Sequence, residues 1–310
     1  MRKIWNGTAA RDGALALAAA LAAALPAHSG PAAGAEGEIE RLAAWPELAR
    51  EAREHVRFDV ARLREARTPE MGEEARAALV AIGAAAAPLL LDSLGRERDE
   101  AARGRIRAVL EAVTGPAHTR LLAAEFAVRE GAVRTWALER AARFPDSGTR
   151  EAALAAWRAV LARAAKKGEK AEKEAADREL LAAALAVTAS GATEALPHLF
   201  SRACAEWRRV GVAARTAAEA VRGEEATAFL LGRLGGERAE EIGALRLLAA
   251  CGTREGAAPR VAPYLDAEDV VVRVAAINAL RGIVDGAPPL EELSAFDAIE
   301  MAREWKSRLR

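Results

Sequence analysis

The stretch TREGAAPRVAPYLDAEDVVVRVAAINALRGIVDG (residues 253–286) decides the fold. Its pattern predicts a helix up to Leu265, a turn over residues 266–269, and a second helix that ends near Gly286. The second helix repeats apolar residues at spacings of three and four, which places them on one face. That face carries Val272, Ala276, Ala279, Leu280 and Ile283. The unit is therefore interpreted as a pair of antiparallel amphipathic helices.

Helix endings like the one at Gly286 recur along the chain. Glycine past a helix end tolerates the left-handed backbone conformation, so it is the expected stop signal. The intervals between these glycines are 32, 33, 43, 32, 29 and 34 residues, which indicates about six stacked helix pairs. The glycines are Gly83, Gly115, Gly148, Gly191, Gly223, Gly252 and Gly286.

Two upstream stretches align with the second helix of the last unit. In ARGRIRAVLEAVTG (residues 102–115), Arg103 falls at the position of Arg273. Further along, Val133-Arg134 reproduces Val272-Arg273. Proline also recurs in the predicted first helices, where an interior proline is expected to kink the helix. These prolines are Pro88, Pro197, Pro259 and Pro263.

A kinked first helix with proline, followed by Asp, Val-Arg, Ala-Leu and a closing Gly, resembles HEAT repeats. It looks most similar to the bacterial HEAT-like group related to phycobilisome-lyase repeats. The resemblance implies an all-α fold, a right-handed α-solenoid of stacked antiparallel helix pairs. In that family an aspartate and an arginine form a hydrogen-bonded ladder between neighbouring repeats. The resemblance gives this structural role to Asp269, Arg273, Arg103 and Arg134, and Gly211 stands where the fifth unit should have its arginine.

The rest of the chain is organised around this repeat array, which is expected over residues 70–286. Residues 36–69 are predicted to form an N-terminal cap of one or two helices, and residues 287–310 a C-terminal capping helix. Residues 165–177 hold four of the six lysines and account for the long interval of 43. They are interpreted as a solvated loop, with a projecting partner-binding hairpin as the alternative.

Residues 1–35 have the order of a secretory signal peptide. Basic residues precede an apolar run over residues 14–25, and small residues at 33 and 35 form a cleavage site. An uncleaved anchor and a buried alanine helix are the alternatives. Removing this segment leaves a net charge of −2 and no segment expected to cross a membrane. The protein is therefore predicted to be exported, to the periplasm or the extracellular space.

Composition excludes several classes of protein. The 45 basic and 45 acidic residues balance, which argues against an electrostatic nucleic-acid binder. The 82 alanines favour close-packed helices, and 4% aromatic residues argue against β-sandwiches and barrels. Cys204 and Cys251 lie in helical patterns and are expected to be small buried thiols, with a bridge between successive repeats as the alternative.

We find no residue set that predicts catalysis, a cofactor or a metal. His55, His118 and His198 are not spaced as metal ligands, and no phosphate-binding or nucleophile motif is present. Paired glutamates lie at helix starts, where they complement the helix dipole. Trp136, Trp157 and Trp207 lie in or beside apolar stripes and are expected in the core.

A partner would be expected on the concave surface formed by the second helices. The non-core positions of these helices mix both charges and are rich in arginine, whose guanidinium suits carboxylates and peptide groups. They are Arg107, Glu111, Glu139, Arg215, Glu219, Arg246, Asn278 and Arg281. Two of the pairs, Arg107–Glu111 and Arg215–Glu219, have i,i+4 spacing and are alternatively explained as solvation of a helix face.

The leading hypothesis is an exported, non-enzymatic scaffold that binds a protein or peptide partner, without nucleic acid or cofactor. Because some HEAT-like relatives attach bilin chromophores or remove damaged bases from DNA, a ligand-handling enzyme is the first alternative. A purely structural spacer in the cell envelope is the second. The binding function rests on fold-level analogy.

Overall fold

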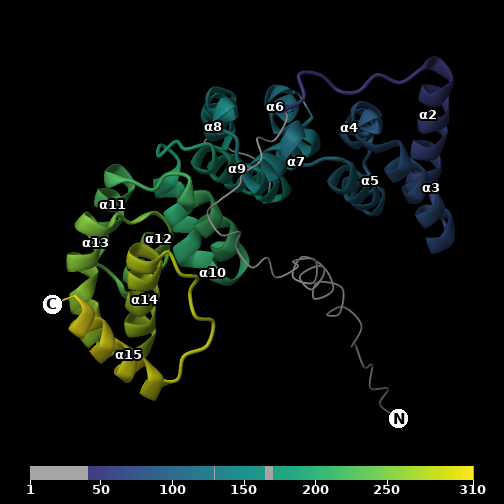
Figure 1. Ribbon diagram of the computed structural model, residues 1–310. Coiled ribbons are helices and arrows are strands. Elements are labelled where there is room, and N and C mark those ends of the chain that lie inside the picture. Colours follow the sequence, from purple (N-terminus) through teal and green to yellow (C-terminus); the bar gives the residue numbers. More distant parts are fainter. Residues whose placement is uncertain (1–40, 129, 165–169, 310) are drawn as a thin grey trace, which may run out of the picture. The chain divides into compact units, whose positions relative to one another are not determined.

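The computed structural model describes residues 41–128, 130–164 and 170–309. All regular elements in these ranges are helices, so the predicted all-α class is confirmed there (Figure 1). The predicted signal peptide, residues 1–35, and residues 165–169 of the charged extension lie outside the described residues.

The α-helices are α2 (Arg50–Glu65), α3 (Pro69–Ile82), α4 (Ala87–Arg96), α5 (Glu100–Val113), α6 (Thr119–Leu122), α7 (Gly131–Arg143), α8 (Arg150–Ala164), α9 (Lys170–Ala189), α10 (Leu196–Glu219), α11 (Glu224–Leu231), α12 (Arg238–Cys251), α13 (Arg254–Val261), α14 (Val270–Leu280) and α15 (Ala295–Arg308).

Short helical turns join several of these elements. Gly83–Ala86 (η1) leads into α4, and Ala123–Ala127 (η3) follows α6. Ala262–Asp266 (η5) follows α13, and Arg281–Asp285 (η6) is a π-helical continuation of α14. Two further 3-10 turns are η2 (Pro116–His118) before α6 and η4 (Ser147–Thr149) before α8.

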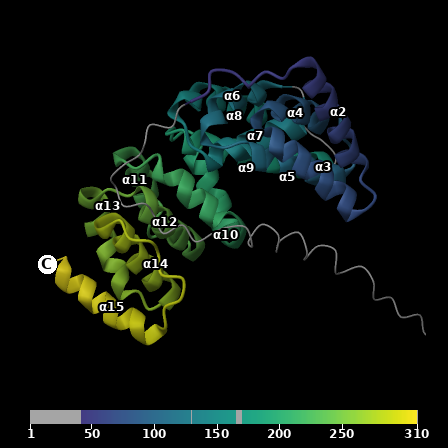
Figure 2. The same cartoon turned by 45° about the vertical axis from the view of Figure 1, so that its right-hand side comes forward.

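The helices from α4 to α14 follow one another in pairs, α4–α5, α6–α7, α8–α9, the two halves of α10, α11–α12 and α13–α14. We call the two members the first and second helices. The second helices pack in succession from α7 through α9, α10 and α12 to α14. First helices also contact one another. α8 contacts η3, the short turn that continues α6, and α11 contacts α13. Figures 1 and 2 show α11 and α13 side by side, next to α12 and α14.

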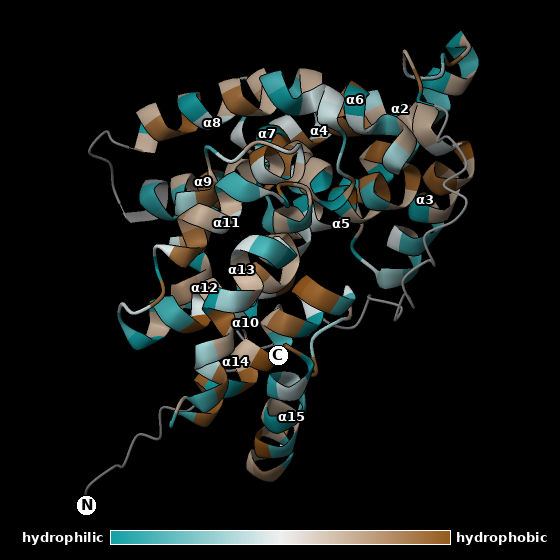
Figure 3. Cartoon of the chain, turned by 60° about the vertical axis from the view of Figure 1, so that its left-hand side comes forward, coloured by the Kyte–Doolittle hydropathy of each residue, from teal (hydrophilic) through white to brown (hydrophobic). Residues whose placement is uncertain are grey.

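The buried side chains form two clusters that share α9. Leu181 and Leu185 belong to the cluster that continues through α10 to α15. Leu180 and Ala183 belong to the cluster that extends back to α2. Many of the buried positions are alanines with no exposed surface, which permits close helix packing. Figure 3 shows hydrophobic and hydrophilic residues alternating along α8 and α15, as expected for helices with one buried face.

The glycines that predicted helix ends do not all act in the same way. Gly83, Gly191 and Gly286 have φ of 76°, 89° and 63°, so the stop-signal argument holds for these three. Gly252 instead has φ −67°. A Cβ at Gly252 would lie 2.7 Å from the carbonyl oxygen of Leu248, so this glycine permits a close approach. Gly115 and Gly223 have extended backbones, and a left-handed turn at these positions was the wrong expectation.

The prolines predicted inside first helices take different positions. Pro259 lies inside α13, which changes to 3-10 geometry after Val261. Pro197 lies in the first turn of α10, where the missing N–H has no helical partner to lose, so the expected interior position is wrong for this proline. Pro88 and Pro263 lie inside continuous helical runs. Pro88 follows the change from the 3-10 turn η1 to α4, and Pro263 follows the change from α13 to the 3-10 turn η5.

The helix pair at residues 196–219, the fifth unit of the sequence pattern, is a single element with a kink. Glu206 has φ −137° and ψ 38° inside α10, so the kink replaces the turn that separates other pairs. Gly211 is buried behind it, and a Cβ there would lie 2.6 Å from the Trp207 ring. An arginine at position 211 would have no room, which explains why this position departs from the pattern of the other units.

From residue 41 onward, where the structure describes it, the N-terminal cap region contains one helix, α2, preceded by residues 41–49 in non-helical conformation. Thr68 begins α3 by accepting a hydrogen bond from the Met71 amide at 3.3 Å. The continuous helical run Pro69–Arg96 (α3, η1 and α4) has the length and apolar composition of a membrane-crossing helix, properties that the core helices of other proteins share. Its Leu79, Leu90 and Leu94 side chains have no exposed surface in this structure.

Candidate binding surface on the second helices

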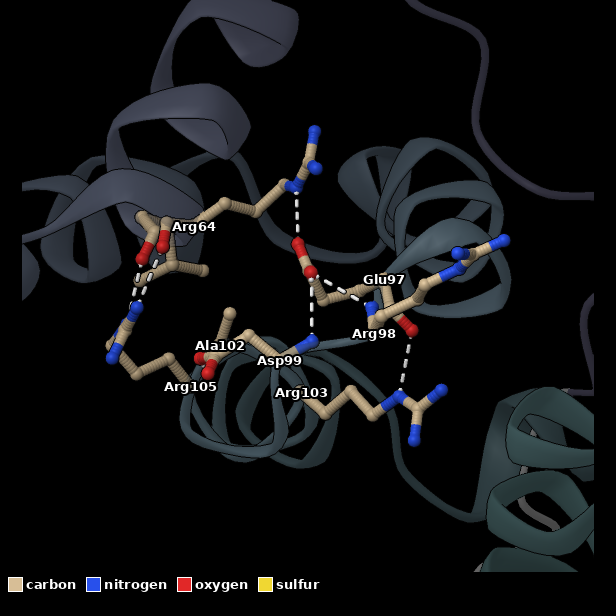
Figure 4. A network of polar contacts seen from close by, with 8 residues as sticks. Arg64, Glu97, Arg98, Asp99, Ala102, Arg103 and Arg105 are labelled. Atoms are coloured by element: carbon tan, nitrogen blue, oxygen red, sulfur yellow. Dashed lines mark hydrogen bonds and ion pairs between the residues drawn. The ribbon is translucent and has the colours of Figure 1, made fainter.

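The turn before a second helix is built around one arginine. Asp99 begins α5 by accepting a hydrogen bond from the Ala102 amide at 2.7 Å. One turn later, Nε of Arg103 donates to the Glu97 carbonyl oxygen at 2.7 Å, which closes the turn (Figure 4). The Glu97 carboxylate accepts from the Arg98 and Asp99 amides and from Arg64 of α2, at 2.8, 3.0 and 2.7 Å. Arg64 and these amides lower the Glu97 pKa to about 2.

The same contact occurs at both other arginines that aligned in the sequence. Arg134 donates to the Val128 carbonyl oxygen at 2.6 Å, and Arg273 donates to that of Ala267 at 2.7 Å. In all three cases the acceptor lies six residues before the arginine. The sequence alignment of Arg103, Arg134 and Arg273 therefore corresponds to one local geometry.

Charged contacts between neighbouring pairs involve Asp269 and Arg134. Asp269 caps α14 by accepting from the Val271 amide at 2.8 Å, and it forms an ion pair with Arg238 at the start of α12. Arg134 pairs with Glu179 of α9 at 2.7 Å, and Arg163 of α8 reaches the same carboxylate at 2.6 Å. The Glu179 and Arg134 side chains are only 9% and 11% exposed.

Arginines also cap the ends of preceding helices, a contact that sequence reasoning missed. Arg105 of α5 donates to the Leu63 and Arg64 carbonyl oxygens at the end of α2, at 2.7 and 2.6 Å. Arg140 of α7 donates to the Glu111 carbonyl oxygen and the Thr114 hydroxyl near the end of α5, at 2.6 and 3.1 Å. Burial lowers the Arg140 pKa to about 10. These contacts could not be predicted from the sequence, because each arginine bonds to main-chain oxygens of another helix about 30 to 40 residues earlier.

The predicted surface residues of α5 and α7 lie near an arginine that the sequence did not indicate. Arg178 of α9 pairs with Glu139 of α7 at 3.2 Å. The pKa of Arg107 is lowered, first by burial and then by the charge of Arg178. Arg107 lies 3.6 Å from Glu100, and its Nε is buried without a hydrogen-bond partner. Arg178 was missed because the extension at residues 165–177 interrupts the repeat spacing.

Arg246 is the most unusual member of the predicted set. Its guanidinium lies over the Trp207 ring, 4.7 Å from the centroid, and burial lowers its pKa. Among the described residues no carboxylate pairs with it. The ninth residue of α7, of α12 and of α14 is Glu139, Arg246 and Asn278, respectively. Equivalent positions of α7, α12 and α14 are therefore polar.

The remaining predicted residues divide into two groups. Asn278 exchanges hydrogen bonds with the Leu290 main chain at 2.8 and 3.2 Å, and Arg281 donates to the Pro288 carbonyl oxygen at 3.3 Å. These two side chains thus hold the connection to α15. Glu111 and Glu219 are exposed and Arg215 is half-buried. Within the described ranges neither i,i+4 pair, Arg107–Glu111 or Arg215–Glu219, forms an ion pair.

The tryptophans and cysteines are mostly structural. Trp136 and Trp157 are buried, at 2% and 6% exposure, whereas Trp207 is half-buried beneath Arg246. Cys204 and Cys251 are free thiols. Burial raises their pKa values to about 11 and 12, which makes the reactive thiolate scarce at neutral pH.

Comparisons with known proteins add no relative. No protein-family model, curated protein or solved structure matches the chain. In the part of the chain that the structure describes, no group of three or more His, Cys, Asp or Glu side chains is arranged to hold a metal ion.

Proposed function

We propose that this protein is an exported, HEAT-like α-solenoid scaffold that binds a protein or peptide partner on the face of its second helices. The repeat is supported by the shared contact of Arg103, Arg134 and Arg273 with carbonyl oxygens six residues upstream. The succession of second helices from α7 to α14 is consistent with a stack. Export rests on the pattern of residues 1–35.

Arg246 carries the binding part of the proposal. A half-buried guanidinium has lost part of its hydration, and Trp207 offers it a ring face but no counter-charge. A carboxylate from a partner would form a charge-assisted hydrogen bond with the edge of the guanidinium while its face stays over the Trp207 ring. The partner is accordingly a protein segment with an exposed aspartate or glutamate.

The experiment is selection of displayed random peptides on the purified full-length chain, followed by titration of the enriched peptides. We expect enrichment of Asp- and Glu-containing sequences, with binding weakened about tenfold or more in Arg246→Gln, since a charge-assisted hydrogen bond contributes about 1.5–3 kcal/mol. Arg260→Gln is the matched control, because Arg260 is exposed on α13 and forms no ion pair in the described structure. Equal loss in both variants, or enrichment without acidic residues, would refute the surface.

The two alternatives predict different results. A bilin-handling enzyme should develop visible absorbance when mixed with the pigment, and a base-removing enzyme should release bases from DNA. A structural spacer should yield no enriched peptide at all. Finding the intact residues 1–35 on protein in the cytosol would contradict export.

A further inference from the structure

Residues 41–48 form a segment that we call the N-terminal strap. It is non-helical, it precedes α2, and its sequence is RLAAWPEL. Three contacts of different chemistry attach it to the turns around α6 and α8: an ion pair, a main-chain hydrogen bond and a ring stack. The strap is therefore bound to this part of the protein in the manner of a non-helical peptide ligand.

The ion pair joins Arg41 to a carboxylate that the protein holds in place by other means. Nε of Arg41 lies 2.7 Å from Asp146, whose side chain is only 3% exposed. Asp146 also accepts from Arg120 at 3.1 Å and from the Gly148 amide at 2.8 Å. Because these two donors belong to the helical body, the carboxylate stays oriented whether or not Arg41 is present.

The other two contacts use equally fixed groups. The Leu42 amide donates to the Ala117 carbonyl oxygen at 3.2 Å. The Trp45 ring stacks on His118, with centroids 5.6 Å apart and an interplanar angle of 14°. His118 is held by the Gly115 amide, which donates to its Nδ1 at 3.0 Å. The imidazole therefore presents one face to whatever occupies the position of Trp45.

We propose that Asp146, Ala117 and His118 form a peptide-binding site that the strap occupies in cis. Its ligand class is a non-helical peptide with an arginine four residues before an aromatic residue. The arginine pairs with the buried carboxylate, the amide that follows it donates to the Ala117 carbonyl oxygen, and the aromatic ring stacks on the imidazole. The strap bends at residues 43–44, so the Cα atoms of Arg41 and Trp45 lie closer together than the roughly 14 Å that four extended residues would span. The site lies on different residues from the Arg246 surface and does not depend on the function proposed for it.

The strap masks the site in the intact chain. A tethered segment acts at an effective concentration in the millimolar range, so a free peptide with the same contacts competes poorly. Weakening the strap should therefore open the site to peptides added in trans. The variant Arg41→Ala/Trp45→Ala does this without shortening the chain.

The test uses fluorescence polarisation of a labelled RLAAWPEL peptide with full-length proteins. We expect saturable binding to the Arg41→Ala/Trp45→Ala variant. For a peptide Kd of about 0.1 mM or tighter, the apparent affinity for the wild type should be lower by roughly tenfold or more, because the millimolar cis concentration then exceeds the Kd at least tenfold. Adding Asp146→Asn to the opened variant should weaken binding about tenfold, and a peptide with alanine in place of its arginine should lose affinity similarly. Arg246→Gln should change nothing, since Arg246 lies on another surface.

Two results would overturn the proposal. One is an opened variant that keeps its helical circular dichroism but fails to bind the peptide; the other is equal binding by wild type and opened variant. If the opened variant does not fold, amide hydrogen exchange of the wild type decides. Peptide added well above the millimolar cis concentration should then accelerate exchange at Leu42 while α7 stays protected, and unchanged exchange at Leu42 under that excess would reject the site.

Discussion

Arg103 and Arg273 make the same contact in two distant helix pairs. Each guanidinium donates at 2.7 Å to the carbonyl oxygen six residues before it, that of Glu97 or Ala267. Both arginines lie in the first turns of helices capped by an aspartate, Asp99 or Asp269. The aspartate cap and the arginine–carbonyl hydrogen bond together thus fix how a second helix begins after its turn.

Replacing either arginine by alanine should destabilise the protein by about 1–3 kcal/mol, because a part-buried carbonyl loses its charge-assisted donor. Thermal unfolding followed by circular dichroism measures the effect. The double variant Arg103→Ala/Arg273→Ala should show additive losses, since the sites share no partner. Arg260→Ala is the control and should change stability by less than about 0.5 kcal/mol. A loss of stability no larger than that of Arg260→Ala would show that the arginine–carbonyl hydrogen bond does not stabilise the turn.

Glu179 should be more sensitive than any exposed carboxylate. Glu179→Gln leaves Arg134 and Arg163 facing a neutral amide in a site that is largely closed to water, and removal of one partner from a buried pair costs about 3–5 kcal/mol. Because the Arg163 side chain is 43% exposed, water can hydrate its guanidinium after the carboxylate is lost, so we expect a cost at the lower end of that range. Glu139→Gln breaks the exposed pair with Arg178 and should cost less than about 1 kcal/mol. Similar costs for the two variants, measured by urea unfolding, would contradict this ranking.

Acidification should destabilise the protein through His118 and His198. Burial lowers the pKa of both imidazoles below the ordinary 6.5. A lowered pKa means that the unfolded chain binds protons first, so stability is complete above pH 6.5 and falls as the pH drops toward the folded-state values. The measurement is the urea midpoint between pH 8 and 5. His118→Gln should flatten part of the slope and His118→Gln/His198→Gln more of it; an unchanged slope in the double variant would exclude both groups.

A second acid transition should come from Glu97. Its pKa of about 2, set first by Arg64 and then by the Asp99 and Arg98 amides, lies well below the ordinary 4.5. Stability from this group is therefore present above pH 4.5 and lost as the pH falls from there toward 2. Glu97→Gln should be less stable than the wild type at pH 7 and lose less stability below pH 4.5. Parallel curves for the two proteins would rule out this role.

Gly211 and Gly104 should respond oppositely to alanine. A Cβ at Gly211 would lie 2.6 Å from the Trp207 ring, so Gly211→Ala forces the ring to move and should cost about 1–3 kcal/mol. Gly104 lies inside α5 with open space around it, so Gly104→Ala should stabilise by about 0.5–1 kcal/mol through helix propensity. Thermal unfolding of the two variants compares them directly. Destabilisation by both would show that helix packing does not distinguish the two positions.

Sequence periodicity predicted the parts of the structure that depend on local spacing. Asp269 and Val272 placed the start of α14, and the match of Arg103 to Arg273 located α5. The effect of the Arg178 charge on Arg107 could not be predicted, because the charged extension at residues 165–177 shifts the repeat spacing between α5 and α9. The strap was missed for a different reason: residues 41–48 have no helical periodicity, and the partners of Arg41 and Trp45 lie in turns far along the chain.

Two of the predicted surface residues contact another part of the same chain, which the sequence pattern did not indicate. Asn278 and Arg281 occupy positions on the second helix that the repeat would leave free. The connection to α15 returns to them through Leu290 and Pro288. A repeat pattern assumes another repeat beyond each unit, so it cannot anticipate what the last unit contacts.

The double membership of α9 has a consequence for cooperativity. Every residue from Glu179 to Ser190 is buried, and the helix supplies side chains to both hydrophobic clusters. Local opening of a repeat array normally stops at a weak interface between neighbours. Here neither half can melt alone without exposing the leucines and alanines that the other half needs. We therefore expect the two clusters to unfold together as one cooperative unit, because both depend on α9.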